Sequence, residues 1–450
     1  MAQLGDAIAR YHKLFEEEAF RDLGWADALQ DEMRRRGLAD SGRLVSPILR
    51  PHFISRRQLE MLSRAAEHLA AILDQVEALA LQNPGLLNRL HMLPAEKMLA
   101  TIPAGYSRLS VTSRMDAHLQ NGSLCLRGFE TCKSRGFAYC EPLTNLFLEL
   151  EILKRFKRGR YKLSKIGGIK RLLAAILQVW KEFGGRTQPN IAVLEFLDRP
   201  GSGPNEGRLL AEMFTEGGAP ARVVSPEQLT YSGGKLRADG FEIQVVFRRI
   251  LTRELLAHFD LSHPLLLAYR DGAVCVVNSF RSEIAQRRAL FDLLTDETVN
   301  SRLAFPDRKL IRAFVPWTRV VAPKKTKYKD QEVDLPEFIL RGREQFVLRP
   351  NDDTGDNRVY VGAQMNQPAW EHALRVALRS PYVVQERLAF DRSVFPVYQY
   401  GELQMKEAEI SVHPHVFNGK MHGATAALET SSAGYAAPLA IAPVLLLEES

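Results

Sequence analysis

Residues 343–388 read REQFVLRPNDDTGDNRVYVGAQMNQPAWEHALRVALRSPYVVQERL, and the order of hydrophobic patterns in this stretch decides the fold. Apolar runs at 345–349 and 359–361 lie on either side of a polar segment, which predicts two strands joined by a loop. Over 367–378, apolar side chains recur three and four residues apart, as on one face of a helix. Another apolar run follows at 382–386. The stretch therefore predicts the order strand, loop, strand, helix, strand.

The polar loop between the first two predicted strands is a candidate phosphate site. Its small polar residues leave backbone N–H groups available to an anion, and Arg349 at the end of the preceding strand supplies positive charge. Asp352, Asp353 and Asp356 would repel phosphate unless a metal ion lay between them. An ordinary hairpin with a solvated polar turn has the same composition, so both interpretations stay open.

This stretch, together with two upstream segments, resembles the circularly permuted ATP-grasp proteins, whose better-known relatives include the glutathionylspermidine synthetases. The upstream segments are HPLLLAYRDGAVCVVNSFRSEIAQRRALFDLLTD at 263–296 and FVPWTRVV at 314–321, and the resemblance runs from about Ala104 to the mid-420s. It implies an ATP-grasp fold and the ATP-dependent joining of a carboxylate to an amine through an acyl phosphate. The implied cofactors are ATP and Mg²⁺, and the implied substrates are a small-molecule carboxylate and amine.

The resemblance places cations at the phosphate positions, with altered identity. Arg349 and Arg288 stand where relatives have lysines. The charge is kept, but a planar guanidinium replaces a compact ammonium, and the exchange is not conservative at a tight phosphate site. Arg114, Arg288 and Arg349 are the candidate catalytic residues, and Arg349 also counts as a contact to the nucleotide. ATP binding is expected to survive this change better than phosphoryl transfer.

Of the two motifs that form the metal site in relatives, this sequence preserves one and alters the other. Arg114 and Asp116 match an Arg-x-Asp motif in which the arginine meets phosphate and the aspartate holds metal. The next motif of relatives, Glu-x-Asn, falls on 128–130, so that Gly128 replaces the glutamate and Glu130 replaces the asparagine. Asp116 and Glu130 are the candidate Mg²⁺ ligands, because Mg²⁺ prefers oxygen donors. Whether Glu130 restores a carboxylate to the site or faces solvent stays open.

The adenine and loop positions differ in how well they are preserved. The run YVVQER at 382–387 resembles the hinge strand of relatives, which implies that Val384, Gln385 and Glu386 contact adenine. A plain sheet edge would have a similar sequence. Relatives continue the loop with Tyr-Gly-Gly-Lys-Gly, whereas this chain has TGDNR at 354–358, which leaves Gly355 and Asn357 as candidate nucleotide contacts. The loss of glycines and of the lysine disfavours closure over a triphosphate.

Composition and patterning bound the class of protein. A chain of 450 residues that is 46% hydrophobic and 25% charged is typical of a soluble globular protein of two or three domains. Four cysteines without metal spacing or a dense disulfide pattern favour reduced thiols. Met1 to Phe20 lacks the apolar core of a signal peptide, and the longest apolar run, 436–447, is too short to cross a bilayer. We therefore expect a cytoplasmic protein without membrane contact.

The expected fold class is α/β (α+β), a circularly permuted ATP-grasp fold with a helical N-terminal region. Helical periodicity dominates the first hundred residues, which are expected to supply packing or an oligomer surface. From Asn190 the pattern becomes α/β, with strands expected at 191–197, 221–224, 243–247 and 274–277. The expected divisions are a helical region at 1–100, a metal and substrate-motif region at 101–185, an α/β wall at 186–300 and the nucleotide-binding half at 301–450.

Two further features have competing explanations. Nine basic residues and no acid lie between Lys154 and Arg171, which favours either an anionic partner or a solvated helix end and loop. The run lacks aromatic platforms and any recognised nucleic-acid module, so nucleic acid is not the expected partner. His413 and His415 form a His-x-His pair that suggests a metal, but without a third nearby ligand packed or solvent-facing histidines are the alternative.

Two functions of different classes follow. The first is an ATP-dependent carboxylate–amine ligase whose degenerate phosphate and metal motifs impair catalysis. The alternative is a non-catalytic paralogue, a pseudoenzyme that keeps the fold to act as a partner or scaffold subunit, in a homo-oligomer or with another protein. Fold resemblance alone does not decide between them.

Overall fold

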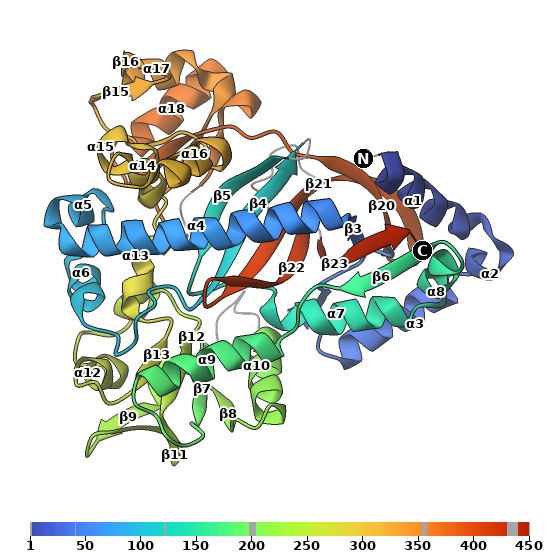
Figure 1. The fold of residues 1–450 in the computed structure, drawn as a ribbon, viewed down its shortest axis with the longest axis horizontal. Helices are drawn as coiled ribbons and strands as arrows, with labels where there is room; N and C mark the ends of the chain where they lie inside the picture. The colour runs from blue at the N-terminus through green and yellow to red at the C-terminus, as the bar shows by residue number, and fades with distance from the viewer. Residues whose placement is uncertain are drawn as a thin grey trace.

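A central sheet of eight strands organises the molecule. The computed structural model of the chain describes residues 2–40, 42–120, 123–197, 204–352, 358–429 and 440–449. Six strands of this sheet follow in the order β3-β23-β22-β21-β4-β5, while β20 pairs with β21 and β6 pairs with β23 (Figure 1). The strands are His52–Ile54 (β3), Thr112–Gln120 (β4), Ser123–Glu130 (β5), Tyr161–Lys165 (β6), Arg392–Gln399 (β20), Glu402–Phe417 (β21), Lys420–Glu429 (β22) and Ala440–Glu449 (β23).

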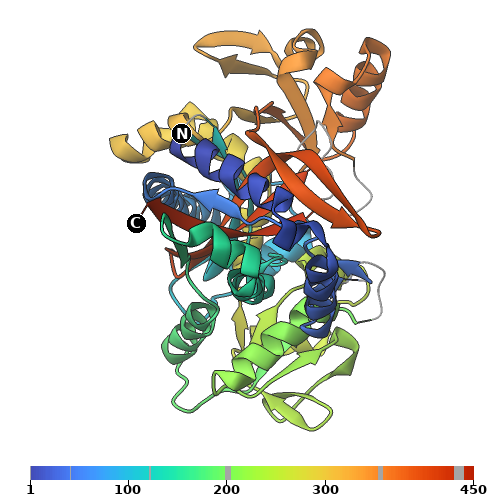
Figure 2. The same ribbon diagram turned by 90° about the vertical axis from the view of Figure 1, so that its right-hand side faces the viewer.

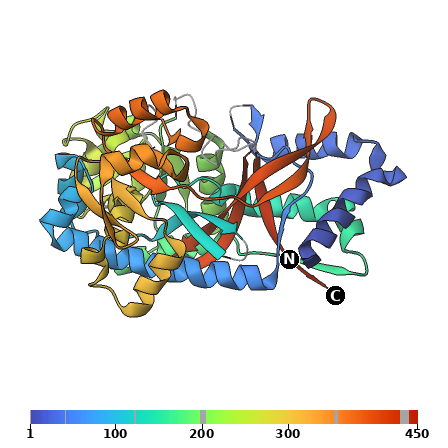
Figure 3. The ribbon, with the colours of Figure 1, turned by 90° about the horizontal axis from the view of Figure 1, so that it is seen from above.

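Alternation along β4 and β21 gives this part of the central sheet one apolar and one polar face. In β21 the residues 409–417 read EISVHPHVF, and successive side chains of a strand point to opposite faces. Val412 pairs with Ala117 and His415 pairs with Arg114, so β4 and β21 alternate in phase. Helix α4 (Arg56–Gln82) covers the apolar face, as Figures 1 and 3 show. The polar face carries Arg114, Asp116, His118, Glu130, Glu409, Ser411, His413, His415 and Glu429.

Helices predominate in the first hundred residues, as expected. Helix α4 begins where Ser55 accepts a hydrogen bond from the backbone N–H of Gln58, whose side chain accepts one from the backbone N–H of Ser55. This capping box satisfies two amides that the first turn leaves without partners. The other elements of this region are α1 (Ala2–Lys13), α2 (Glu18–Arg21), α3 (Gly24–Arg35), α5 (Pro84–Arg89), α6 (Pro94–Thr101), β1 (Ala39–Asp40) and β2 (Arg43–Leu44).

A parallel four-stranded sheet, the wall, lies on one side of the central sheet. Its order is β13-β12-β7-β8, and all its pairs are parallel. The strands are Ile191–Leu194 (β7), Ala221–Val224 (β8), Val245–Arg248 (β12) and Cys275–Val277 (β13), close to the expected ranges. Helices α10 (Pro204–Glu216), α11 (Thr252–Leu256) and α12 (Pro264–Arg270) and the meander β9 (Leu229–Ser232), β10 (Lys235–Ala238) and β11 (Phe241–Ile243) complete this part. Helices α7 (Phe137–Glu149), α8 (Glu151–Lys157) and α9 (Lys170–Glu182) contact the central sheet at β23, β6 and β21, respectively.

The stretch at 343–388 lies in a second four-stranded sheet, the small sheet, on the opposite side of the central sheet (Figure 2). The predicted order of elements is confirmed for the described residues: β17 (Phe346–Pro350), β18 (Tyr360–Val361), α18 (Gln367–Ala377) and β19 (Tyr382–Glu386). Trp370 of α18 is fully buried against Leu348 and Val384. The surrounding elements are α13 (Glu283–Gln286), α14 (Ala289–Thr295), α15 (Glu297–Asn300), α16 (Phe305–Phe314), β14 (Thr318–Val320), β15 (Lys325–Tyr328), β16 (Gln331–Asp334) and α17 (Leu335–Arg341).

The basic run contains a strand where a helix end and loop is one expectation. Residues 161–165 form β6, which pairs antiparallel with β23 through residues 445–449. The run does contain a helix end, at Lys157, and a turn at 158–160, but 161–165 is a strand, because the strand at 440–449 supplies pairing that a local pattern does not reveal. Several of the basic side chains have acidic partners: Lys154 pairs with Glu151 and Arg155 pairs with Glu17.

Two general expectations can be compared with the described residues. The four cysteines lie among them and form no disulfide with one another. None of the described helices combines the length and the hydropathy needed to cross a membrane.

Candidate active site

The small sheet contacts the polar face of the central sheet through Arg349. The Arg349 side chain is 4% exposed, and its Nη1 donates to the backbone oxygen of Arg127 in β5 at 2.7 Å. The same Nη1 donates to Oε1 of Gln385 in β19 at 3.1 Å. Since Arg349 also lies within electrostatic range of Asp116, the structure brings a predicted phosphate cation and a predicted metal ligand together from distant parts of the sequence.

Arg114 joins the two predicted metal ligands. Its Nη2 lies 3.0 Å from Asp116 Oδ1 and 2.8 Å from Glu130 Oε1. Arg114 and Glu130 are direct partners across β4 and β5, which accounts for the contact. Glu130 therefore turns toward the polar face, and the alternative in which it faces solvent is wrong. Burial acts to raise the pKa of Asp116, but the Arg114 guanidinium and further cations hold that pKa well below its usual range.

The candidate ligands are of the type that Mg²⁺ prefers, but they are too few to hold the ion by themselves. Asp116 and Glu130 offer carboxylate oxygens, but both are engaged by Arg114. Across the described ranges, no three His, Cys, Asp or Glu side chains gather closely enough to hold a metal. A side chain at Gly128 would meet Asp116 Oδ2 at 3.3 Å. A magnesium ion here would therefore take most of its ligands from phosphate oxygens and water.

Arg288 lies at the start of α14, beside the end of β17. Its Nη1 donates to the backbone oxygen of Pro350 at 2.7 Å, and its backbone N–H donates to the oxygen of Asn351 at 3.0 Å. Asn351 Oδ1 in turn accepts from the backbone N–H of Ala289 at 2.8 Å. Arg288 is thus next to the strand that carries Arg349, but in this structure its guanidinium holds the backbone of that strand.

The residues predicted to contact adenine are already bonded to, or packed against, neighbouring side chains. Gln385 Nε2 donates to Thr318 Oγ1 at 3.1 Å, and its Oε1 accepts from Arg349. Glu386 accepts from the hydroxyl of Tyr328 at 2.8 Å. The Val384 side chain lies in the core between the small sheet and its helices, with Trp370. Gly355 and Asn357 lie outside the described residues.

A pair of acids on the polar face was missed by sequence reasoning. Glu409 and Glu429, here called the acidic pair, are direct partners across β21 and β22 and are 6% and 4% exposed. Glu409 Oε1 lies 2.8 Å from Arg392 Nη2, and Glu429 Oε1 lies 4.0 Å from Arg127 Nη2. The in-phase alternation of 113–119 and 409–417 is the signal that could have placed Glu409 on the same face as Asp116.

The two histidines of the His-x-His pair are packed, as one alternative expected. His415 Nε2 lies 3.2 Å from Thr425 Oγ1, and its ring contacts Phe137 edge to face. His413 Nε2 lies 3.7 Å from Asp116 Oδ1. Burial lowers the pKa of each histidine to about 3, so both are neutral near pH 7. The metal interpretation gains no third ligand among the described residues.

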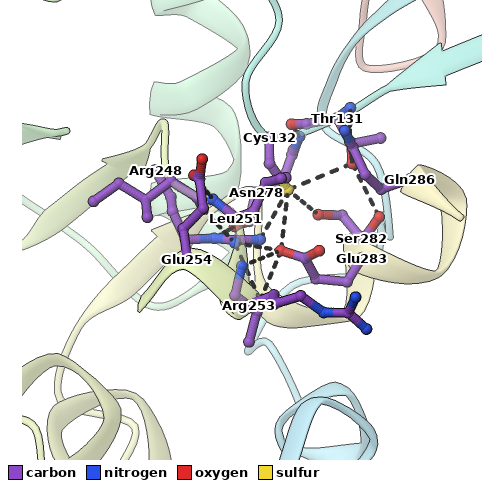
Figure 4. Close-up of polar contacts among 12 residues, drawn as sticks. Thr131, Cys132, Arg248, Leu251, Arg253, Glu254, Asn278, Ser282, Glu283 and Gln286 are labelled. Carbon is purple, nitrogen blue, oxygen red and sulfur yellow. Dashed lines mark hydrogen bonds and ion pairs between the residues drawn. The ribbon is translucent and has the colours of Figure 1, made fainter. Parts of the chain in front are cut away.

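Two buried arginine networks lie near the site, and the first begins at Arg248 of the wall strand β12. In Figure 4 the side chains of Cys132 and Glu283 point toward the Arg248 guanidinium, which donates to Cys132 Sγ at 3.0 Å and to Glu283 Oε1 at 2.6 Å. All three nitrogens of Arg248 have partners, so this network is support for the site. In the second network Arg287 bridges Glu96 and Asp352, and Asp352 is the last described residue before the candidate loop.

Comparison with known proteins shows similarity to solved structures but not to families by sequence. No family model matches the sequence, and no curated protein matches it. A glutathione synthetase-like effector (GSS30) from Globodera pallida, in its apo form, is similar with a TM-score of 0.63 and 13% identity, over 94% of this chain and 96% of that chain. The two proteins share a fold. A candidate gamma-glutamylcysteine synthetase from Methylobacillus flagellatus KT is less similar, with a TM-score of 0.44 and 12% identity over 86% and 87% of the two chains.

The acidic pair predicts a specific pH dependence of stability. Burial, together with Glu409 and Asp116 and against the effect of Arg127, raises the pKa of Glu429 from 4.5 to about 7. A raised pKa contributes stability that is complete below pH 4.5 and is lost as the pH rises through 7. We expect the free energy of unfolding of Glu429→Gln, taken relative to that of the natural protein, to rise by about 3 kcal/mol between pH 4.5 and pH 8. Urea unfolding at both pH values measures this, and parallel behaviour of the two proteins would contradict it.

Proposed function

We propose that the protein is a circularly permuted ATP-grasp protein of the ATP-dependent carboxylate–amine ligase type, with weak nucleotide binding and impaired catalysis. One observation carries the proposal: Arg349 of the small sheet lies against the strand pair that holds Arg114, Asp116 and Glu130. A nucleotide between the two sheets would meet a cation on one side and carboxylates on the other, which suits Mg-ATP. The fold shared with a glutathione synthetase-like effector supports it.

The proposed roles are those that the resemblance to the ATP-grasp proteins implies. Arg114, Arg288 and Arg349 bind and orient the phosphates, and Asp116 with Glu130 would hold Mg²⁺. Val384, Gln385 and Glu386 border adenine, while Gly355 and Asn357 belong to the loop over the phosphates. Bound ATP would supply the phosphoryl group that activates the carboxylate. The chain's contribution is to place that carboxylate in line and to exclude water.

The existing contacts explain why binding should be weak. Phosphate must compete with Asp116 and Glu130 for Arg114, and with Gln385 and the Arg127 carbonyl for Arg349. Each contact that opens subtracts from the affinity that the phosphate contacts provide.

Because these arginines already bind groups within the chain, they also support the second candidate, a non-catalytic paralogue that serves as a partner or scaffold subunit. Arg114, Arg288 and Arg349 all bind groups of the chain itself. An arginine that holds carbonyls and carboxylates in place stabilises a fold without any substrate. Purification of the native chain from its source, with identification of the proteins that accompany it, examines this candidate.

A thermal melt with millimolar Mg-ATP tests nucleotide binding. We expect the melting temperature to rise with ATP concentration, because a ligand that binds only the folded state stabilises it by mass action. Arg349→Ala should weaken the shift, whereas Arg349→Lys should keep or increase it, since a compact ammonium suits phosphate. Arg341→Ala is the matched control, because its side chain is 79% exposed. An ATP-independent melt, or equal shifts in Arg349→Ala and the natural protein, would count against the site.

A further inference from the structure

The outer face of helix α16 carries an exposed aromatic ring among basic side chains. Four residues of the helix recur at spacings of three and four and therefore share one face, here called the α16 face: Phe305, Arg308, Lys309 and Arg312. The Phe305 side chain is 71% exposed, and Lys309 and Arg312 are exposed as well. The Arg308 guanidinium lies over the Phe305 ring, 5.7 Å from its centroid. The α16 face thus combines apolar surface with positive charge.

The opposite face of α16 attaches the helix to the rest of the fold. Ile311 is 1% exposed in the core, and Leu310 and Phe314 pack against the same cluster. The helix contacts α4, β5 and α14. In Figure 3 the gold helix α16 lies at the edge of the molecule, next to α4. The α16 face is therefore presented to solvent by a helix that is packed on its other side.

The charges of the α16 face are not neutralised by nearby acids. Within the described ranges, none of its three bases forms an ion pair. Asp296 and Glu297, which precede the helix, already pair with other bases. Asp307, the one acid of α16, lies two residues from Phe305 and so falls on another side of the helix. By contrast, the exposed Arg341 of α17 pairs with Glu337 one turn earlier, as is usual on a solvated helix.

The exposed ring distinguishes the α16 face from the basic run at 154–171. The aromatic side chains of that run, Phe156 and Tyr161, are 0% and 3% exposed. A surface that offers charge alone attracts any polyanion. Phe305 gains free energy only when its ring leaves water, and an aromatic ring among bases is the combination that enters the headgroup region of a bilayer.

We propose that the α16 face docks on the surface of an anionic phospholipid bilayer. Phe305 enters the headgroup region, while Lys309 and Arg312 lie against the anionic headgroups. The contact is peripheral, because α16 has 10 residues and is too short to cross a bilayer. This role goes beyond the proposed function. It departs from the sequence-based expectation of no membrane contact, which considered only segments that could cross a bilayer or direct export.

Co-sedimentation with lipid vesicles tests the electrostatic part of the proposal. We expect the natural protein to bind vesicles of equal parts phosphatidylcholine and phosphatidylserine, to leave phosphatidylcholine vesicles unbound, and to be released by high salt. Lys309→Gln with Arg312→Gln should weaken binding about 25-fold, because each base near an anionic membrane adds about fivefold. Lys325→Gln with Arg341→Gln is the matched control, with the same change in net charge at side chains that are 69% and 79% exposed on other elements. It should keep binding within about twofold.

The insertion of Phe305 has a readout of its own. Phe305→Trp should keep vesicle binding, and its fluorescence should shift to shorter wavelength on binding by more than that of the natural protein, because the new indole leaves water. Phe305→Ser should bind anionic vesicles at least about fivefold more weakly. Thermal melts of each variant show that it is folded.

Other outcomes would overturn the proposal. These are absence of binding to anionic vesicles, equal binding to neutral and anionic vesicles, and equal losses in the control and the Lys309, Arg312 variant. Binding that Phe305→Ser retains in full, with no added shift in Phe305→Trp, would reduce the contact to adsorption by charge. Binding of polyglutamate that depends on Lys309 and Arg312, without vesicle binding, would assign the face to an acidic protein instead. None of these measurements involves Mg-ATP, so they fail or succeed independently of the proposed function.

Discussion

Replacing Arg287 with methionine is expected to lower the free energy of unfolding by about 3–5 kcal/mol. The Arg287 side chain is 2% exposed, and it is paired with Glu96 of α6 and with Asp352, whose Oδ2 lies 2.7 Å from Nη1. Methionine keeps much of the volume but removes the buried cation, which leaves Glu96 and Asp352 with only the partly exposed Arg253. Chemical unfolding followed by circular dichroism measures the loss. Because Asp352 comes directly before the candidate loop, the nucleotide-dependent stabilisation should weaken as well.

An exposed arginine pair provides the comparison. Arg341 pairs with Glu337 within one helix, and their side chains are 79% and 58% exposed. Arg341→Met should cost less than about 1 kcal/mol, because exposed pairs gain little from their charges. If both methionine variants unfold at the same denaturant concentration, the Arg287 network contributes no more than a surface pair and the argument from burial fails.

The second large effect concerns turnover. On the proposed function, we expect very slow or no phosphate release from Mg-ATP by the natural sequence, because the resemblance places Arg349 where relatives have a lysine and leaves the loop only one of their three glycines. A variant with Thr354→Tyr, Asp356→Gly, Asn357→Lys and Arg349→Lys should release phosphate about a hundredfold faster, because it restores backbone donors and a compact cation together. A coupled assay for phosphate measures both proteins.

Two controls make this result decisive. Asp116→Ala in the rebuilt protein should abolish the gain if Asp116 holds the metal. Brisk ADP formation by the natural chain, abolished by Asp116→Ala, would remove the pseudoenzyme alternative. A rebuilt protein that binds ATP but never hydrolyses it would locate the defect at Gly128 and Glu130, where Arg114 now takes the carboxylate.

Local patterns predicted the local elements well. The helix at 367–377 and the strand at 382–386 follow from short-range periodicity, and the structure has them within one residue of the expected ends. The capping of α18 by Asn366, which accepts from the N–H of Ala369, is equally local. Such features depend on neighbours within a few residues, and the sequence states them directly.

Long-range pairing and side-chain engagement could not be obtained in this way. Nothing near Glu409 or Glu429 in the sequence announces that they are cross-strand partners, because a strand pair depends on contacts that sequence order does not specify. The resemblance placed Arg114 and Arg349 at phosphate positions, but only coordinates reveal that the first binds Glu130 and the second binds a backbone oxygen. The charged residues can be counted from a sequence, but the groups that each of them contacts are known only from the three-dimensional structure.

The pairing of early strands with the last strand of the central sheet has a consequence for biosynthesis. β3, at residues 52–54, pairs with residues 444–446 of β23, and β6 pairs with the same strand. A ribosome extends the chain from its N-terminus, so these strands leave the exit tunnel long before their partner exists. Until the last ten described residues emerge, the apolar face beneath α4 is incomplete, and late closure of such distant pairs slows folding. Completion of the central sheet therefore waits for β23, which is synthesised after every other strand of that sheet.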